Sequence, residues 1–186
     1  MGGQFRRWLN SAPGARDEFA RTLFRRTFAD QFHPEIRVQG EELRALRFLL
    51  AVDEARFVRE NAEWLKTVLA RIGWFDMRVY GPEASQAAWL LVQHSDHDPA
   101  WQRSVLALLS EKVRSGDFQP NYFAYLSDRV AVNAHEPQRF GTQGHCAGPG
   151  DWQPFALVAP AAELDSRRAG VGLEPIDRYR ARFQCR

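Results

Sequence analysis

The chain has 186 residues, a formal net charge of +2 and two cysteines. This near-neutral charge excludes a general electrostatic attraction to nucleic acid or to an anionic membrane, so only a local patch can supply one. Hydrophobic residues make up 45% of the sequence, including 13 Phe and 6 Trp, which argues against wholesale disorder. The expected molecule is one domain with appended ends.

The cysteines and the hydropathy pattern predict a cellular location. Cys146 lies in a loop-like stretch and Cys185 lies next to the C-terminus. Two cysteines are too few for a disulfide scaffold or a cysteine-rich zinc site, so a reducing compartment fits best. No signal-like apolar run follows the N-terminal arginines, and nowhere do about eighteen apolar residues run together. We therefore expect a cytoplasmic protein without a membrane partner.

The first expected helix covers residues 15–31. Its aromatic and aliphatic residues recur at helical spacing with arginines between them: Phe19, Leu23, Phe24, Phe28 and Phe32. We expect residues 1–40 to form an Arg/Phe-rich N-terminal helix packed on a single helical domain of residues 41–186. An alternative gives RNA or membrane-surface contact to the arginines at positions 6, 7, 16, 21, 25 and 26, but core packing explains the Phe stripe more economically.

Residues 41–96 contain three expected helices and one segment with a weaker pattern. Helices are expected over residues 41–51 and 53–71, the second of them ending at Gly73 in the position of a C-terminal cap. Residues 74–82 show an alternating pattern that predicts an extended connection or one short strand. A helix from Glu83 to about Asp96 is apolar nearly all round, which predicts burial on several sides.

The second half of the chain is helical with one interruption. Asp98 and Pro99 begin a helix that ends at Gly116, and residues 121–130 have helical spacing. Residues 133–160 are rich in Gly and Pro and predict a long irregular segment. Helical character returns over residues 161–169 and after Pro175. The expected fold class is mainly α, a compact multi-helix domain with a long irregular Gly/Pro-rich segment.

The first candidate site is the segment from Gln93 to Pro99, which holds two imidazoles and two carboxylates after an apolar run. If the helix continued to Asp98, His94 and His97 would lie beside Asp98 on one face, a spacing that permits a divalent metal as cofactor. The competing hypothesis makes Asp98 the N-cap of the next helix. His94 is expected to be partly buried, with Asp96 or Gln93 as its hydrogen-bond partner.

The second candidate site is the segment from Gln138 to Gln143 in the Gly-rich region. Arg139 offers a fork of N–H donors for a carboxylate or phosphate, Thr142 and Gln143 offer neutral hydrogen bonds, and Gly141 allows the backbone to approach a ligand closely. The alternative is structural, with the guanidinium of Arg139 paired to Asp96 or Asp128 so that the loop is pinned to the helices.

Four stretches resemble a bacterial family of uncharacterised proteins with the motifs QHxDxDPxxQ and PQRxGTQ. The stretches are AAWLLVQHSDHDPAWQ, YLSDRVAV, PQRFGTQ and LDSRRAGVGLEPIDRY, and the resemblance runs from about Asp53 to Tyr179. It implies that these residues belong to the family pattern: Gln93, His94, Asp96, Asp98, Gln102, Asp128, Arg129, Arg139, Gly141, Thr142 and Gln143. Similar proteins often have Tyr at Phe140, and His97 looks replaceable, which weakens the two-histidine metal site. The resemblance implies a location and no reaction.

We expect both candidate segments and the Asp128-Arg129 helix end to meet in one polar pocket. In the enzyme hypothesis, His94 is general base or metal ligand, Asp96 orients it, and Arg139 binds an anionic group of a small molecule or peptide that is hydrolysed or modified. The expected binding residues are Gln93, Asp128, Arg129, Thr142 and Gln143. The alternative is a noncatalytic binding or immunity-type protein with a protein partner, in which the same cluster is a structural network.

Overall fold

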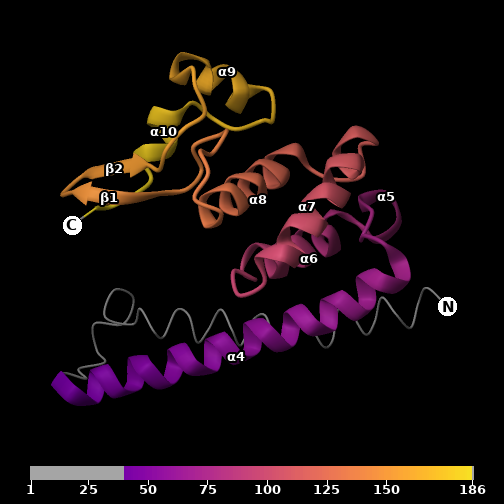
Figure 1. Cartoon of the computed structure of the whole chain (residues 1–186), viewed down its shortest axis with the longest axis horizontal. Helices are drawn as coiled ribbons and strands as arrows, with labels where there is room; N and C mark the ends of the chain where they lie inside the picture. The colour runs from indigo at the N-terminus through magenta and orange to yellow at the C-terminus, as the bar shows by residue number, and fades with distance from the viewer. Residues whose placement is uncertain (1–39, 186) are drawn as a thin grey trace. The chain divides into compact units, whose positions relative to one another are not determined.

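The computed structural model describes the backbone of residues 40–185 and the side chains of residues 55–185. Within these residues the chain is mainly α, with seven α-helices, one 3-10 helix and a two-stranded sheet (Figure 1). The chain divides into two compact units, Met1–Gly73 and Trp74–Arg186. The predicted N-terminal helix, its packing on the core and the alternative of RNA contact all fall outside the described residues.

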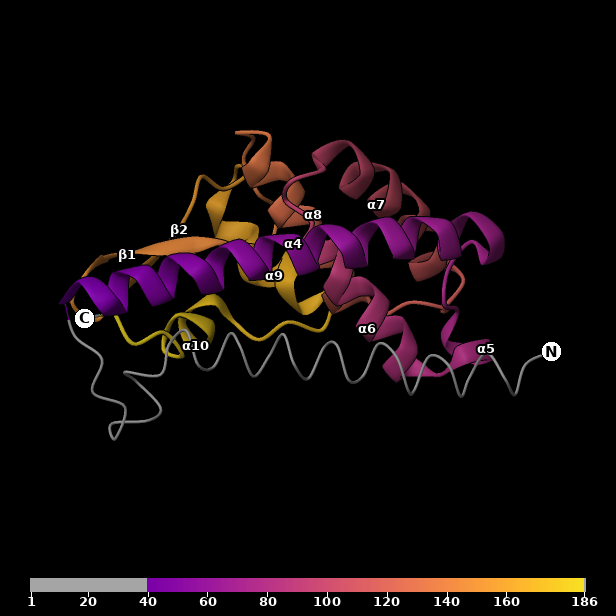
Figure 2. The ribbon, with the colours of Figure 1, turned by 90° about the horizontal axis from the view of Figure 1, so that it is seen from below.

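The described part of the first unit is one helix, α4 (Gly40–Ile72), which runs without interruption (Figure 2). The predicted break near Val52 is wrong, because after Gly40 the helix contains no glycine or proline that would end it. The predicted end is confirmed. Gly73 has φ +76° and its N–H donates to the carbonyl of Leu69 at 2.8 Å, a common way to end a helix.

The second unit begins with a short helix, α5 (Met77–Tyr80). The predicted strand or extended connection over residues 74–82 is therefore wrong. Gly81, with φ +87°, ends this turn of helix, and its N–H donates to the carbonyl of Met77 at 3.0 Å. The helix is too short for hydrophobic periodicity to reveal it, and its position depends on distant polar contacts.

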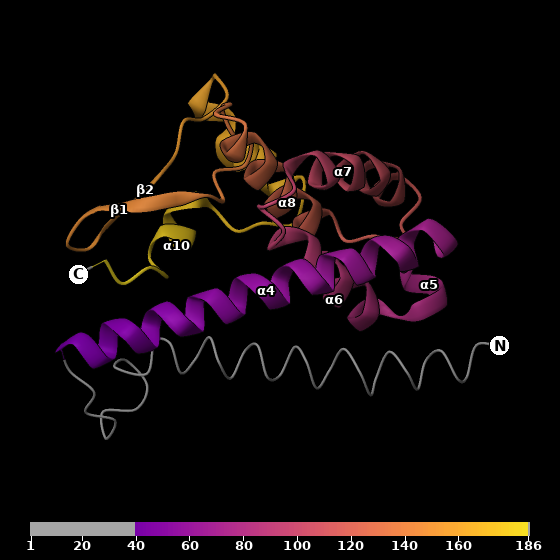
Figure 3. The ribbon, with the colours of Figure 1, turned by 60° about the horizontal axis from the view of Figure 1, so that its bottom comes forward.

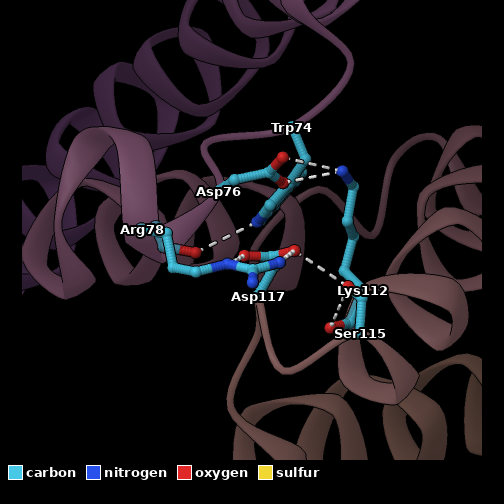
Figure 4. Close-up of polar contacts among 7 residues, drawn as sticks. Trp74, Asp76, Arg78, Lys112, Ser115 and Asp117 are labelled. Carbon is cyan, nitrogen blue, oxygen red and sulfur yellow. Dashed lines mark hydrogen bonds and ion pairs between the residues drawn. The ribbon is translucent and has the colours of Figure 1, made fainter.

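These contacts form the polar cluster drawn in Figure 4. The buried carboxylate of Asp117 accepts two hydrogen bonds from the guanidinium of Arg78, both at 2.5 Å, and one from the hydroxyl of Ser115 at 2.9 Å. The ammonium of Lys112 donates to Asp76 at 2.8 Å. The hydrogen bonds from Arg78 lower the pKa of Asp117, although burial opposes the change. The cluster thus links residues that lie 36 to 39 positions apart.

Three helices form the centre of the second unit: α6 (Pro82–Gln93), α7 (Pro99–Arg114) and α8 (Pro120–Asn133). All three were predicted, and each begins with a proline in its first turn, where the missing N–H costs nothing. They pack against one another, and the rings of Trp89 and Tyr122 stack with centroids 4.5 Å apart. Their buried apolar side chains include Ala88, Trp89, Val92, Val105, Leu109, Ala124, Leu126 and Val130.

A hairpin lies within the Gly/Pro-rich residues 133–160. Its strands, β1 (Gly144–Gly148) and β2 (Asp151–Pro154), pair antiparallel with an irregularity in the register. The pattern did not predict this sheet, because neither strand shows the alternation of a half-buried strand. Gly144 has to be a glycine, because a Cβ there would come within 2.3 Å of the carbonyl oxygen of Gln153.

The C-terminal part returns to helix as predicted, with a 3-10 turn η1 (Ala161–Glu163), α9 (Leu164–Ala169) and α10 (Ile176–Arg180). Figure 3 shows α10 beside the hairpin. Trp152 on β2 meets Tyr179 on α10 edge to face, with ring centroids 5.5 Å apart, and these two side chains form a small buried cluster with Cys185.

A disulfide between Cys146 and Cys185 joins the hairpin to the C-terminus across 39 positions. The sequence analysis did not predict this bond, because the fold brings together two cysteines that the sequence separates. Disulfides are rare in reducing compartments, so the cysteine content no longer supports a cytoplasmic location. None of the helices in the described residues has both the length and the apolar character of a membrane span.

Candidate functional site

The His/Asp segment forms a tight corner between α6 and α7. His94 caps the C-terminal end of α6, and its N–H donates to the carbonyl of Leu90 at 3.1 Å. Asp98 is the N-cap of α7, where its Oδ1 accepts the N–H of Trp101 at 3.0 Å. The capping hypothesis for Asp98 is confirmed. Its carboxylate is engaged in starting the helix.

Asp96 joins this corner to α8. Its Oδ1 accepts hydrogen bonds from Arg129 Nε at 2.7 Å, Asn133 Nδ2 at 2.8 Å and Gln102 Nε2 at 3.3 Å. Its Oδ2 accepts a second hydrogen bond from the same guanidinium, which makes the ion pair bidentate. The carboxylate predicted to orient an imidazole is thus engaged by three side chains of α7 and α8.

These contacts lower the pKa of Asp96. Partial burial by itself raises the pKa of this carboxyl, but the hydrogen bond and charge of Arg129, with the hydrogen bonds of Asn133 and Gln102, outweigh burial and lower it. A carboxylate whose folded pKa lies below its unfolded value of about 3.9 stabilises the fold above that pH. This stabilisation is lost as the pH falls through the folded pKa.

We expect Asp96→Asn to lower the free energy of unfolding at pH 7 by about 0.5–1 kcal/mol, because the side chain is 42% exposed and solvent screens the ion pair. The difference from the wild type should shrink between about pH 5 and pH 2, where the wild-type carboxylate takes up its proton. Urea unfolding at each pH measures it. Glu136→Gln, at an exposed carboxylate, is the control and should show no such convergence. A constant difference at every pH would contradict the ion-pair contribution.

Two buried glutamines belong to the same corner. Gln102 is fully buried, and its Nε2 donates to the carbonyl of Val92 at 2.9 Å and to that of Gln93 at 3.4 Å. These carbonyls lie at the end of α6, where the helix leaves them without intrahelical partners. Gln93, a predicted binding residue, is only 6% exposed. Both glutamines therefore lie in the interior of the corner.

The two histidines of the segment have different environments. His94 is exposed, so its predicted partial burial is wrong, because the side chain follows the last turn of α6 rather than continuing its buried face. His97 is half-buried, and its Nε2 has no hydrogen-bond partner among residues 55–185. Among residues 55–185, no three His, Cys, Asp or Glu side chains are grouped so that they could hold a metal ion.

Asp128 points from α8 to the second candidate segment. It is fully buried, and its Oδ1 accepts the N–H groups of Arg139 and Phe140, both at 2.9 Å. Its Oδ2 accepts the N–H of Thr142 at 2.8 Å. Burial raises the pKa of Asp128, while the backbone donors oppose the rise. One carboxylate thus holds the whole turn of the loop to α8.

The loop is also held from within. The buried amide of Gln138 donates to the carbonyls of Gln143 at 2.7 Å and Phe155 at 3.1 Å, and its Oε1 accepts the N–H of Gln143 at 2.9 Å. Thr142 Oγ1 accepts a hydrogen bond from the side chain of Gln143 at 3.1 Å. Gly141 has φ +65°, so glycine is required there by the turn. The two predicted hydrogen-bonding residues thus bond to each other.

The backbone of Arg139 is bound on both sides, because its N–H donates to Asp128 at 2.9 Å and its carbonyl accepts a hydrogen bond from Arg167 at 3.0 Å. The side chain of Arg139 is exposed, with the guanidinium carbon 5.9 Å from the centre of the Phe140 ring. The predicted ion pair with Asp96 or Asp128 is wrong, because Asp96 binds Arg129 and Asp128 binds backbone N–H groups. Asp96 therefore joins the first candidate segment to α8, and Asp128 joins the second. That the two segments line one pocket remains a prediction.

Arg168 was not among the candidate residues predicted from the sequence. This side chain on α9 is 0% exposed. Its Nη1 donates to the carbonyl of Phe140 at 2.6 Å and its Nε donates to that of Glu174 at 2.7 Å. A signal for its burial exists, because it follows the buried Leu164 by four positions and so lies on the same face of the helix.

Comparison with known proteins identifies a family and nothing more specific. No curated protein and no solved structure matches this chain. The model of one family, described as a family of unknown function (DUF6624), matches residues 38–184 and so covers both candidate segments and α9. The arginine-rich residues before position 38 lie outside the match, as the resemblance implied. The chain therefore belongs to this family of unknown function.

Proposed function

We propose that this protein is a noncatalytic binding protein in which the carboxylates of the polar motifs hold the helices and the loop together. The observation that supports this most is the environment of Asp128. Complete burial and three backbone N–H donors leave this carboxylate no role at a ligand. The two carboxylates of the first candidate segment also stabilise the fold. Asp98 caps α7, and Asp96 forms an ion pair with Arg129.

The loop over residues 138–143 carries one exposed cation, Arg139, and is suited to bind an anionic ligand. The loop over residues 138–143 is fixed by Asp128 on one side and by Gln138 on the other. Because a preorganised loop loses little entropy when it binds, its contacts contribute more of their energy to affinity. Arg139 is exposed on this loop, and its guanidinium can donate two parallel hydrogen bonds to a carboxylate. The proposed ligand is therefore a small molecule or peptide with an accessible carboxylate.

The second candidate function is the enzyme hypothesis, a small hydrolase or modifying enzyme. The exposure of His94 favours it, because an accessible imidazole can exchange protons with a bound ligand near neutral pH. In this hypothesis His94 is the general base and Arg139 binds the anionic group of the substrate. Asp96 would act through its hydrogen bonds rather than as an acid, since its lowered pKa keeps it ionised.

Substitution of the two exposed residues separates these functions. We expect Arg139→Ala to weaken the binding of short acidic peptides at least about tenfold, because it removes a charge-assisted hydrogen bond. His94→Ala should leave this affinity unchanged, and neither variant should change the melting temperature. Isothermal titration with the peptides measures the affinity. Arg178→Ala, at another exposed arginine, is the matched control and should bind as the wild type does.

Two results would contradict the proposal. One is equal binding of the peptides by the wild type and Arg139→Ala. The other is turnover of ester, phosphate or peptide substrates by the wild type that His94→Ala lacks while it keeps the wild-type melting temperature. The second result would establish the enzyme hypothesis.

A further inference from the structure

The two cysteines of the disulfide lie in different surroundings. Cys146 is exposed on β1, a strand whose three middle residues are all exposed. Cys185 is buried and belongs to the cluster that contains Trp152 and Tyr179. A thiolate that attacks a disulfide has to reach one of the two sulfurs, so access selects the sulfur that is attacked. Exposed disulfides are also the more labile ones, and the exposed side of this bond is Cys146.

The disulfide fixes the residues that follow α10, 181–185, which we call the C-terminal strap. The ring of Phe183 stacks on that of Trp152, with centroids 4.5 Å apart and planes 8° from parallel. Trp152 is buried under this stack, whereas Phe183 is 37% exposed. The N–H of Gly150, in the turn of the hairpin, donates to the carbonyl of Cys185 at 2.8 Å. The C-terminal strap thus covers Trp152 and is tied to both ends of β2.

The other contacts of the C-terminal strap are local or exposed to solvent. The N–H groups of residues 181–183 donate to carbonyls only three or four positions before them. Phe183 also meets the ring of Tyr179 edge to face, with centroids 5.2 Å apart. Arg182 forms an ion pair with Glu174 at 2.6 Å, but its side chain is 63% exposed and water screens the pair. The covalent bond is therefore the strongest link between the C-terminal strap and the hairpin.

We propose that the disulfide is a site of thiol–disulfide exchange, at which a dithiol reductant attacks Cys146 and opens the C-terminal strap. The attacking thiolate forms a bond to Sγ of Cys146 while the S–S bond breaks, and Cys185 leaves as a thiolate that takes up a proton. The second thiol of the reductant then attacks the mixed disulfide and releases Cys146 as a thiol. The reductant gives up two electrons and two protons and becomes a disulfide. This site goes beyond the proposed function, because it does not depend on Arg139.

Trapping of the mixed disulfide tests which sulfur is attacked. The oxidised wild-type chain is incubated with a dithiol oxidoreductase whose second, resolving cysteine is replaced by serine, and free thiols are then blocked with N-ethylmaleimide. Trypsin separates the two cysteines, because Cys146 lies in the peptide 140–167 and Cys185 in the peptide 183–186. We expect the oxidoreductase on Cys146 and the maleimide on Cys185. The reverse assignment, or the absence of a mixed disulfide, would overturn the proposal.

Hydrogen exchange of the Gly150 amide tests the opening of the C-terminal strap. Because this N–H bonds to the carbonyl of Cys185, reduction by dithiothreitol should speed its exchange at least about tenfold, and reoxidation should restore the original rate. In Cys146→Ala/Cys185→Ala, which has no bond to reduce, dithiothreitol should leave the rate unchanged. An unchanged rate in the reduced wild type would overturn the proposal. Loss of the helical circular dichroism on reduction would also overturn it, because the strap would then not open separately from the fold.

Discussion

Replacement of Asp128 by alanine is expected to lower the free energy of unfolding by about 3–5 kcal/mol, because buried donors lose their common acceptor. The three N–H groups of Arg139, Phe140 and Thr142 all bond to this carboxylate. A loss of this size removes a large part of the about 5–15 kcal/mol by which a typical domain is stable. Urea unfolding at pH 7, followed by circular dichroism, measures it.

Two further variants sharpen this result. Asp128→Asn keeps the shape and one acceptor oxygen, so its loss should lie between those of the wild type and the alanine variant. Asp177→Ala removes a carboxylate that is 90% exposed, and should change the free energy of unfolding by less than about 0.5 kcal/mol. If the alanine variants at positions 128 and 177 lost equal stability, the loop would not depend on the buried carboxylate.

Removal of the disulfide should have the second large effect. The bond closes a span of 39 positions between Cys146 and Cys185, for which the loss of loop entropy in the unfolded chain corresponds to about 3–4 kcal/mol. The double variant Cys146→Ala/Cys185→Ala should lose about this much stability. Reduction of the wild type should lower its stability by a similar amount and leave the double variant unchanged. Urea unfolding with and without reductant compares the two.

The disulfide prediction has a clear contrary outcome. If reductant left the stability of the wild type unchanged while free-thiol titration showed that the bond was reduced, the bond would contribute nothing to the fold. The packing of Trp152 against Tyr179 and the hydrogen bond from Arg180 Nε to the carbonyl of Trp152 would then hold the hairpin to α10.

Much of the helical architecture follows from local signals in the sequence. The proline in the first turn and the cap at Asp98 mark the start of α7, and Gly116, with φ +76°, follows its end. These signals act within one turn of helix, so a single sequence contains them. The uninterrupted α4 was divided in error into residues 41–51 and 53–71, although no proline or internal glycine interrupts the backbone there.

The sequence predicted which residues belong to the candidate site, but it did not predict which of them bond to one another. The acidic and basic side chains were recognised, yet the acceptor of Arg139 was assigned to Asp96 or Asp128. Successive residues of a helix point about 100° apart, so the neighbours Asp128 and Arg129 serve different segments. Asp128 turns to the loop, while Arg129 reaches Asp96. Such directions depend on how α8 packs against its neighbours.

The sequence by itself determined the mainly α class and the starts of α6, α7 and α8, and offered Asp98 as an N-cap, because these depend on interactions between residues at most four positions apart. Only the tertiary structure decided that Cys146 and Cys185 pair, that Asp128 binds a backbone turn and that Arg168 is buried. Each of these contacts joins residues 11 or more positions apart. Their physical origin is the tertiary packing within the unit of residues 74–186, which sets the direction of these buried polar groups.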